Sequence, residues 1–180
     1  MAIKSTIFKV ELSISDMRRH YYAEHMLTIA RHPSETDERM MMRVLAFALN
    51  AHERMEFGKG LSNDDEPDVW LKSLSGEIDL WIDVGRPDEE RIRKASSRAN
   101  KVIVWAFGGN TADMWWKTIE EKITRFKNVT VHKLPPEQSR ALALFAKRTT
   151  QLQCTIEDES AWLSDNESTI EIELTTLFPA

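Results

Sequence analysis

Apolar and polar residues alternate along two parts of the first half of the chain, a pattern typical of strands with one buried face. The alternation over Thr6–Ser15 predicts a strand, whereas Asp16–Arg31 fits either a second strand or a short helix. Val69–Leu74 and Glu77–Val84 alternate in the same way and are separated by Ser75-Gly76. We therefore expect a β-hairpin there, with a two-residue turn.

A long helix is expected between these strands. Ser34 and Asp37 have the spacing of a capping box, and the stretch from Glu35 to Phe57 has helical length without glycine or proline. Apolar residues cover most of its circumference, which predicts a largely buried helix. Residues 58–67 contain glycine, acidic residues and a proline, and they predict a loop.

Helices and strands alternate in the second half. A proline at position 87 suits the first turn of a helix, and the acidic residues after it lie near the positive end of the helix dipole. A strand, a helix and a strand in succession imply a right-handed parallel crossover. The expected elements are a helix from Pro87 to about Asn100, a strand over Lys101–Gly109, a helix over Thr111–Phe126, a strand over Val129–Leu134, a helix over Pro136–Thr149, and terminal strands over Gln151–Phe178 with a turn at Asp165-Asn166.

Length and composition are those of an ordinary globular domain. The chain has 180 residues, of which 42% are hydrophobic and 29% charged, and it is long enough to bury a sizeable core. Together with the order of elements, this predicts a single domain over residues 1–180 with a mixed α/β (α+β) fold. Helices are expected to flank one mixed central sheet.

Charge and cysteine content narrow the classes of function. The net charge of -5 argues against a nucleic-acid coat protein, which is usually basic, but not against an enzyme that contacts nucleic acid through a local patch. No apolar stretch reaches membrane-spanning length, and the first residues lack the apolar core of a signal peptide. Cys154 is the sole cysteine, which excludes a disulfide within the chain and a cysteine-cluster metal site. We therefore expect a cytoplasmic protein without a membrane partner.

The hairpin carries the most distinctive chemistry. A turn at Ser75-Gly76 sets the opposed pairs as Leu74–Glu77, Lys72–Asp79, Trp70–Trp81 and Asp68–Asp83. Two opposed carboxylates destabilise a sheet unless they share a proton, bind a cation, or lie in a different register. Mg²⁺ binds oxygen ligands, usually one or two carboxylates with waters and phosphates. Asp68 and Asp83 are therefore a candidate metal pair, and Asp79 on the same face is a third candidate ligand.

The same features have plainer explanations. A strand with acids on one face is most often a half-solvated strand, and a pair such as Trp70–Trp81 more often packs under a helix than stacks on bases. Glu53 is expected at the end of the long helix, close to the hairpin in sequence, where acids are usually solvated. The hairpin pattern alone thus leaves both a site and an ordinary sheet open.

Arginines near the start of the long helix are a second candidate feature. Arg31, Arg39 and Arg43 are close in sequence and could face a phosphate. Pairing of these arginines with Glu35 and Glu38 is the simpler alternative. The histidines and Cys154 do not have the spacing of a metal or nucleophile site.

Four longer blocks of the sequence are distinctive as a set: LTIARHPSETDERMMMRVLAFAL, GLSNDDEPDVWL, GEIDLWIDVGRPDEERIRKA and AWLSD. Together they closely resemble the YaeQ family of bacterial proteins, over essentially the whole chain. The resemblance implies a variant of the PD-(D/E)XK, or restriction-endonuclease-like, core: a helix, a three-stranded meander, a crossover helix and a further strand. That order agrees with the elements expected from Ser34 to Gly108. Many nucleases of this fold carry an acid on the first core helix, which Glu53 could match.

The nuclease motif can be placed on this sequence residue by residue. The resemblance implies that Pro67-Asp68 is the PD element, whose aspartate binds metal, and that Asp83 is the second acid. The motif lysine is expected two residues later, where this chain has Gly85. Lys94 on the following helix is the candidate substitute cation, with Arg91 behind it. The candidate catalytic residues are thus Asp68, Asp83, Lys94, Glu53 and Arg91, and the candidate metal ligands are Asp68, Asp83 and Asp79.

Three hypotheses for function follow. The first is a phosphodiesterase that acts on nucleic acid with Mg²⁺, or Mn²⁺, and a metal-activated water. The second is a nuclease-like domain that no longer cleaves and binds a protein or nucleic-acid partner, which Gly85 and the acidic net charge favour. The third is structural: the carboxylates only bond to arginines, lysines and loop amides. The resemblance implies no established reaction, although an involvement in transcription has been suggested for the family.

Overall fold

Two mixed β-sheets and four α-helices make up the described part of the computed structural model, which comprises residues 4–59 and 64–179. The first sheet has the order β10-β9-β8-β1-β2 and the second the order β11-β7-β6-β5-β4-β3. Part of the loop expected over residues 58–67 lies outside the described residues. None of the helices within the described ranges has the length and apolar character of a membrane span.

The first sheet consists of strands from the N-terminal and the C-terminal parts of the chain. Its strands are β1 (Thr6–Asp16), β2 (Tyr21–Arg31), β8 (Thr149–Glu157), β9 (Ser160–Ser164) and β10 (Thr169–Glu173). β1 pairs antiparallel with β2 and parallel with β8. The predicted first strand is thus confirmed, and the ambiguous stretch after it is a second strand.

The second sheet carries the hairpin and the crossover. Its strands are β3 (Met55–Phe57), β4 (Val69–Lys72), β5 (Ile78–Val84), β6 (Ala99–Ala106), β7 (Val129–Lys133) and β11 (Thr175–Phe178). β5, β6 and β7 run parallel, as the strand-helix-strand order predicts, whereas β3, β4 and β11 pair antiparallel with their neighbours.

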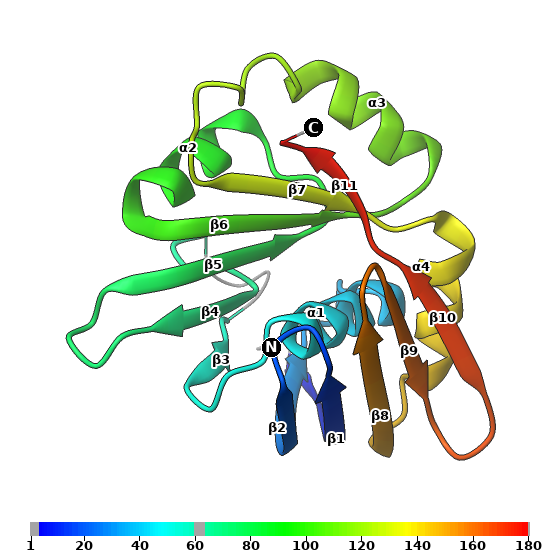
Figure 1. Ribbon diagram of the computed structural model, residues 1–180. Helices are drawn as coiled ribbons and strands as arrows, with labels where there is room; N and C mark the ends of the chain where they lie inside the picture. Colours follow the sequence, from blue (N-terminus) through cyan, green and yellow to red (C-terminus); the bar gives the residue numbers. More distant parts are fainter. Residues whose placement is uncertain (1–3, 60–63, 180) are drawn as a thin grey trace.

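Helix α1 (Asp37–Leu49) lies between the two sheets, so the expectation of one central sheet is wrong (Figure 1). Every residue from Met40 to Leu49 is buried, as the apolar circumference of the helix predicts. A helix that is apolar on all sides needs apolar surfaces on more than one side, and here both sheets contribute side chains to the same core as α1. The sequence pattern of the terminal strands contains no sign that they pair with β1.

The limits of α1 differ from those expected. Thr36, not Ser34, caps the helix, since its hydroxyl accepts a hydrogen bond from the backbone N–H of Arg39 at 3.1 Å. The helix ends at Leu49, and the C-cap residue Asn50 donates from its side-chain amide to the carbonyl of Ala46 at 3.0 Å. The chain then turns into the short strand β3, so the expected helical continuation to Phe57 is wrong.

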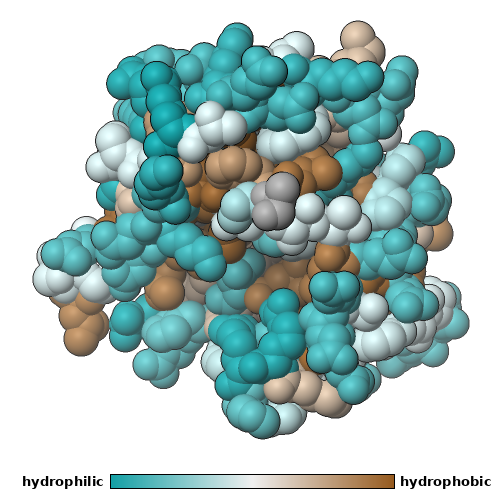
Figure 2. Space-filling view, turned by 45° about the horizontal axis from the view of Figure 1, so that its top comes forward, coloured by the Kyte–Doolittle hydropathy of each residue, from teal (hydrophilic) through white to brown (hydrophobic). Residues whose placement is uncertain are grey.

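The remaining helices cover the outer face of the second sheet and the side of α1. α2 (Glu89–Arg98) and α3 (Asn110–Ile119) pack over the second sheet, whereas α4 (Pro136–Leu142) and the 3₁₀ turn Ala143–Phe145 lie beside α1 (Figure 1). The face of the molecule shown in Figure 2 is largely hydrophilic, and hydrophobic residues are exposed near its centre. Each of these helices is shorter than the corresponding expected segment.

The hairpin has a longer turn than expected. Trp70 pairs with Trp81 as predicted, but Lys72 pairs with Ile78 because the ladder shifts after Leu71. The backbone N–H groups of Ser73 and Gly76 donate to the carbonyls of Glu77 and Ser73, respectively, so the turn is not the two-residue Ser75-Gly76 turn. The pairs Lys72–Asp79 and Leu74–Glu77 are therefore wrong. The last pair of the β4–β5 ladder is Val69–Ile82. Asp68 and Asp83 come directly after this pair, at the open end of the hairpin.

Candidate functional site

A cleft of about 660 Å³ lies where the parallel strands β5 and β6 end. Residues that follow these two strands, among them Gly85, Arg86, Phe107 and Gly108, form part of its lining. Ligands in open α/β sheets commonly bind in such crevices, outside the carboxyl ends of the strands. Four carboxylates line this cleft: Glu38, Asp64, Asp68 and Asp83. Three guanidinium groups line it as well: Arg39, Arg86 and Arg91.

Asp68 lines this cleft, is buried, and forms hydrogen bonds through both carboxylate oxygens. Both of its carboxylate oxygens accept hydrogen bonds from Nη2 of Arg39, at 2.9 and 3.1 Å. Its Oδ2 also accepts from the backbone N–H of Val84 at 2.8 Å, which ties the loop before β4 to the end of β5. Burial and the neighbouring Asp83 raise the pKa of Asp68 above its ordinary value, although Arg39 acts in the opposite direction.

Asp83 is held by the helix that follows it. Nε and Nη2 of Arg91 donate to Oδ2 and Oδ1 of Asp83 at 2.8 and 3.0 Å, a two-pronged contact. Arg91 also donates to the backbone carbonyls of Asp64 and Glu66, both at 2.9 Å. The like charges at the end of the hairpin are thus compensated by two arginines, one from α1 and one from α2.

The arginine of α1 belongs to a longer buried network. Nη1 of Arg39 donates to Oε2 of Glu35 at 2.7 Å, and Arg43 binds both oxygens of Glu35 at 2.6 and 3.0 Å. Arg43 and Glu35 are almost completely buried. The plainer interpretation of the arginines, pairing with acids, is confirmed for Arg39 and Arg43 with Glu35.

Comparison with known proteins identifies the family. A family model described as "YaeQ protein" matches residues 1–174. The chain belongs to the YaeQ family. It is 45% identical over 175 residues to the "Uncharacterized protein YaeQ" of Salmonella typhi and 44% identical to that of Escherichia coli (strain K12), in each case over 97% of both chains. The resemblance seen in the sequence blocks is confirmed at the level of the family.

Crystal structures of two YaeQ proteins have the same fold. The YaeQ protein from Xanthomonas axonopodis pv. citri has a TM-score of 0.93 at 43% identity, with 96% of this chain and 98% of that chain covered. The YaeQ protein from Pseudomonas syringae also has a TM-score of 0.93, at 35% identity, with 98% of this chain and 97% of that chain covered. The two-sheet arrangement around α1 is therefore a feature that this YaeQ-family chain shares with solved members.

The candidate residues taken from the sequence divide into two groups. Asp68, Asp83 and Arg91 line the same cleft. Lys94 does not line the cleft; its ammonium group lies 2.5 Å from Oδ1 of Asp65. Of the two predicted substitute cations, Arg91 is thus the one that reaches the acids.

Glu53 and Asp79 also lie away from the cleft lining. Glu53 is exposed in the turn between α1 and β3, because α1 ends before it, so its expected place on the first core helix is wrong. Asp79 accepts a hydrogen bond from the side-chain amide of Asn100 at 3.0 Å. It sits at the other end of β5 from Asp83, toward the turn of the hairpin.

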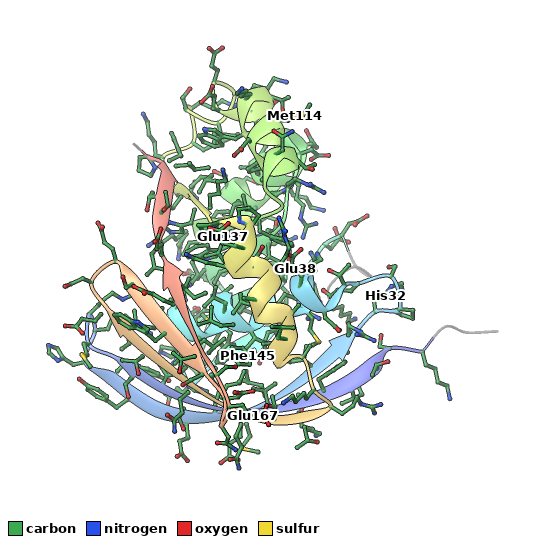
Figure 3. The ribbon with its side chains drawn as sticks, turned by 90° about the vertical axis from the view of Figure 1, so that its right-hand side faces the viewer. His32, Glu38, Met114, Glu137, Phe145 and Glu167 are labelled. Atoms are coloured by element: carbon green, nitrogen blue, oxygen red, sulfur yellow. The ribbon has the colours of Figure 1, made fainter. Side chains whose placement is uncertain are left out.

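Several lining residues were missed from the sequence as members of a common site. Glu38 and Arg39 stand in the first turn of α1, where an acid usually stabilises the positive end of the helix dipole. Glu38 lies beside α4 (Figure 3), and its Oε2 accepts a hydrogen bond from Ser139 at 2.9 Å. Asp64 and Arg86 carry no local motif. Their position in the cleft depends on the two sheets and their connections.

Gly85, where the predicted nuclease motif would have its lysine, has an unusual backbone conformation. Its φ is +106°, in the left-handed region that glycine adopts readily and that strains other residues. Its backbone N–H donates to the carbonyl of Trp105 at 2.8 Å, which fixes this bend in the lining of the cleft. A lysine at this position would have to adopt the same strained backbone.

Proposed function

We propose that the cleft binds a phosphodiester of a nucleic acid and hydrolyses it with a divalent metal ion, Mg²⁺ or Mn²⁺, held by Asp68 and Asp83. The observation that carries the proposal is the meeting of two buried carboxylates with Arg91 in one cleft at the ends of parallel strands. The sequence motif placed the two carboxylates opposite each other, and Arg91 was the candidate cation behind Lys94. The proposal treats the cleft as a modified PD-(D/E)XK site, in which Arg91 stands in for the lysine.

The two carboxylates fit such an ion in kind and number. Mg²⁺ usually binds one or two carboxylates and completes its coordination with waters and substrate phosphates. Within residues 4–59 and 64–179 there is no group of three His, Cys, Asp or Glu side chains suited to a metal, so waters and phosphate oxygens would supply the other ligands. When bound, such an ion neutralises charge on the phosphoryl oxygens and makes a bound water more acidic.

The charge of the cleft favours binding of a phosphodiester together with a metal ion over binding of the phosphodiester alone. With four carboxylates and three arginines in its lining, the cleft has a formal charge of about −1 when all of these groups are ionised. A phosphodiester brings a further negative charge into this cleft. Electrostatic repulsion therefore opposes binding of the phosphodiester by itself. A divalent cation at Asp68 and Asp83 makes the net charge of the cleft positive, so that the phosphodiester is attracted.

Arg86 is the residue best placed to contact the phosphate directly. Unlike Arg39 and Arg91, it forms no ion pair with another described residue. Its Nη1 is 3.4 Å from the position that a Cβ on Gly108 would take, just before α3. α3 begins without a side-chain cap among the described residues, and N–H groups at such a helix start favour anions.

A second candidate function is binding of a nucleic-acid or protein partner without cleavage. It is favoured by the hydrogen bonds at Asp68 and Asp83, since all four carboxylate oxygens already accept from arginine. The strained position of Gly85 adds to this, because it leaves the motif without its lysine. In this case the carboxylates orient the arginines and hold no metal.

Cleavage and binding assays separate these functions. Single- and double-stranded DNA and RNA are incubated with the purified protein in Mn²⁺, in Mg²⁺ and in EDTA, and the same assays are made with Asp83→Asn. The control is Asp79→Asn, which removes a carboxylate from the same strand outside the cleft. We expect metal-dependent cleavage that is lost in Asp83→Asn and retained in Asp79→Asn. Binding in EDTA without cleavage in any metal supports the second function instead.

A further inference from the structure

Arg91 is held in the cleft by two kinds of bonds that respond differently to a metal. Two of its hydrogen bonds end on the carboxylate of Asp83, whose side chain is only 4% exposed. The other two end on the backbone carbonyls of Asp64 and Glu66. A cation that takes the oxygens of Asp83 competes with the first pair and leaves the second pair untouched. The guanidinium can thus lose its carboxylate partner without leaving the cleft.

Arg39 does not have the same freedom. Besides Asp68, it donates to Oε2 of Glu35 at 2.7 Å and lies 3.4 Å from the carbonyl of Val84. When a cation takes the oxygens of Asp68, Arg39 still has a carboxylate partner. Asp83, by contrast, is the one carboxylate among the described residues to which Arg91 donates a hydrogen bond.

The formal charges of the cleft show what the ligands do to each other. The lining carries about −1, so a divalent ion alone leaves +1, and a phosphodiester alone leaves −2. The two together leave the cleft neutral. Uncompensated charge in a partly buried site is costly, so each ligand lowers the electrostatic cost of the other.

From these contacts we propose that Arg91 exchanges its partner, from Asp83 in the metal-free cleft to the phosphate when metal and phosphodiester are both bound. Arg91 is then a substrate-binding residue that couples the two ligands, so that each raises the affinity for the other. The inference rests on the proposed metal site at Asp68 and Asp83, and it adds which residue links that site to the substrate. By thermodynamic linkage, both affinities change by the same factor.

Arg98 provides a closely matched control. Arg91 and Arg98 both lie on α2 or its last turn, both have their guanidinium over the ring of Trp81, at 5.7 and 5.2 Å, and both donate to a backbone carbonyl in residues 64–66. Arg98 does not line the cleft, and among the described residues it forms neither a hydrogen bond nor an ion pair with Asp83. Arg98→Gln therefore removes the same kinds of packing and loop contacts without touching the proposed exchange.

The test measures Mn²⁺ binding with and without dimethyl phosphate, a stable phosphodiester probe. Free Mn²⁺ is followed by electron paramagnetic resonance in the wild type, Arg91→Gln and Arg98→Gln. In the wild type and Arg98→Gln we expect dimethyl phosphate to tighten Mn²⁺ binding by about tenfold, within the usual range for coupled sites. In Arg91→Gln we expect Mn²⁺ alone to bind more tightly than in the wild type, and the effect of dimethyl phosphate to fall below about twofold.

The outcomes distinguish this inference from the proposed function. Mn²⁺ binding that is absent, or unchanged by Asp83→Asn, contradicts the metal site itself. Mn²⁺ binding that depends on Asp83 but shows no effect of dimethyl phosphate, or the same effect in Arg91→Gln, overturns the role of Arg91 and leaves the metal site standing. Arg91→Lys serves if Arg91→Gln melts too low to study: it keeps the charge but not the two-pronged contact, and we expect coupling between those of the wild type and Arg91→Gln.

Discussion

Asp68 and Arg39 join the loop before β4 to helix α1, through contacts of 2.9 and 3.1 Å from one guanidinium nitrogen to both carboxylate oxygens. The Asp68 side chain is 4% exposed and that of Arg39 is 20% exposed. Together with the bond from the N–H of Val84, this contact satisfies a carboxylate that has little access to water. The same aspartate is therefore both a structural link and a candidate metal ligand.

Asp68→Asn should destabilise the protein by about 1–2 kcal/mol, since it weakens the charge-assisted hydrogen bonds to Arg39, which keeps its ion pair with Glu35. Urea unfolding followed by circular dichroism measures this change. Asp79→Asn is the control, and its half-exposed carboxylate should cost less than about 1 kcal/mol. A purely structural role predicts loss of stability alone; an Asp68→Asn protein that keeps its unfolding midpoint and loses cleavage would exclude that role.

Substitution of Gly85 tests whether the backbone at this position tolerates a side chain. Both Gly85→Ala and Gly85→Lys should lower the free energy of unfolding by about 1–2 kcal/mol, because φ is +106° there and a Cβ strains the backbone. No heavy atom lies within 4 Å of the Cβ position, so the cost should come from the backbone and be similar for the two variants. Urea unfolding of both checks this, and a stabilised Gly85→Lys would contradict it.

Local features of the sequence predicted most helices and strands of the fold. They could not predict which strands pair when those strands lie far apart in the sequence. The alternation over Thr6–Ser15, the buried run of α1 and the parallel crossover from β5 to β6 all depend on residues near each other in the chain. The pairing of β1 with β8 joins segments more than 130 residues apart, and no local pattern encodes it. This is why one sheet was expected where there are two.

Part of the candidate site could be predicted because its residues are close to one another in the sequence. Asp68 and Asp83 stand on one hairpin, and Arg91 follows within one helix, so short-range reasoning brings them together. Glu53 was misplaced because nothing in the helical pattern indicates that α1 ends at Leu49. Arg86 and Glu38 reach the cleft through different elements, which only the packing of α1 against the second sheet brings together.

Arg86→Gln should weaken binding of nucleic acid without altering the two carboxylate–arginine pairs. Loss of one phosphate contact should reduce the slope of log affinity against log salt by about 1. Fluorescence anisotropy with labelled DNA or RNA in increasing NaCl measures the slope. Arg93→Gln is the control, since Arg93 pairs with Glu90 on the exposed side of α2. An unchanged slope in Arg86→Gln, or an equal change in Arg93→Gln, would remove Arg86 from the proposed contact.

The buried carboxylate of Asp16 should make the free energy of unfolding depend on pH in the acidic range. Its side chain is completely buried at the end of β1. Burial by itself raises the pKa of Asp16, but hydrogen bonds from Arg18 and Arg19 outweigh it and lower the pKa from 3.8 to about 2. The same two arginines donate to the carbonyls of Leu49 and Ala51, so this cluster fastens the end of α1 to the first sheet.

The sign of the effect follows from the lowered pKa. In the unfolded chain Asp16 takes up a proton near pH 4, whereas in the folded protein it stays ionised to about pH 2. Its contribution, about 2 kcal/mol, is therefore fully present above about pH 4 and is lost as the pH falls to about 2. Asp16→Asn should lower stability by about that amount at pH 7, and urea unfolding from pH 7 to pH 2 should show the two proteins converging below pH 4. Asp113→Asn, which alters an exposed carboxylate, should parallel the wild type throughout. A constant difference between wild type and Asp16→Asn over this range would mean that Asp16 acts through packing and not through its charge.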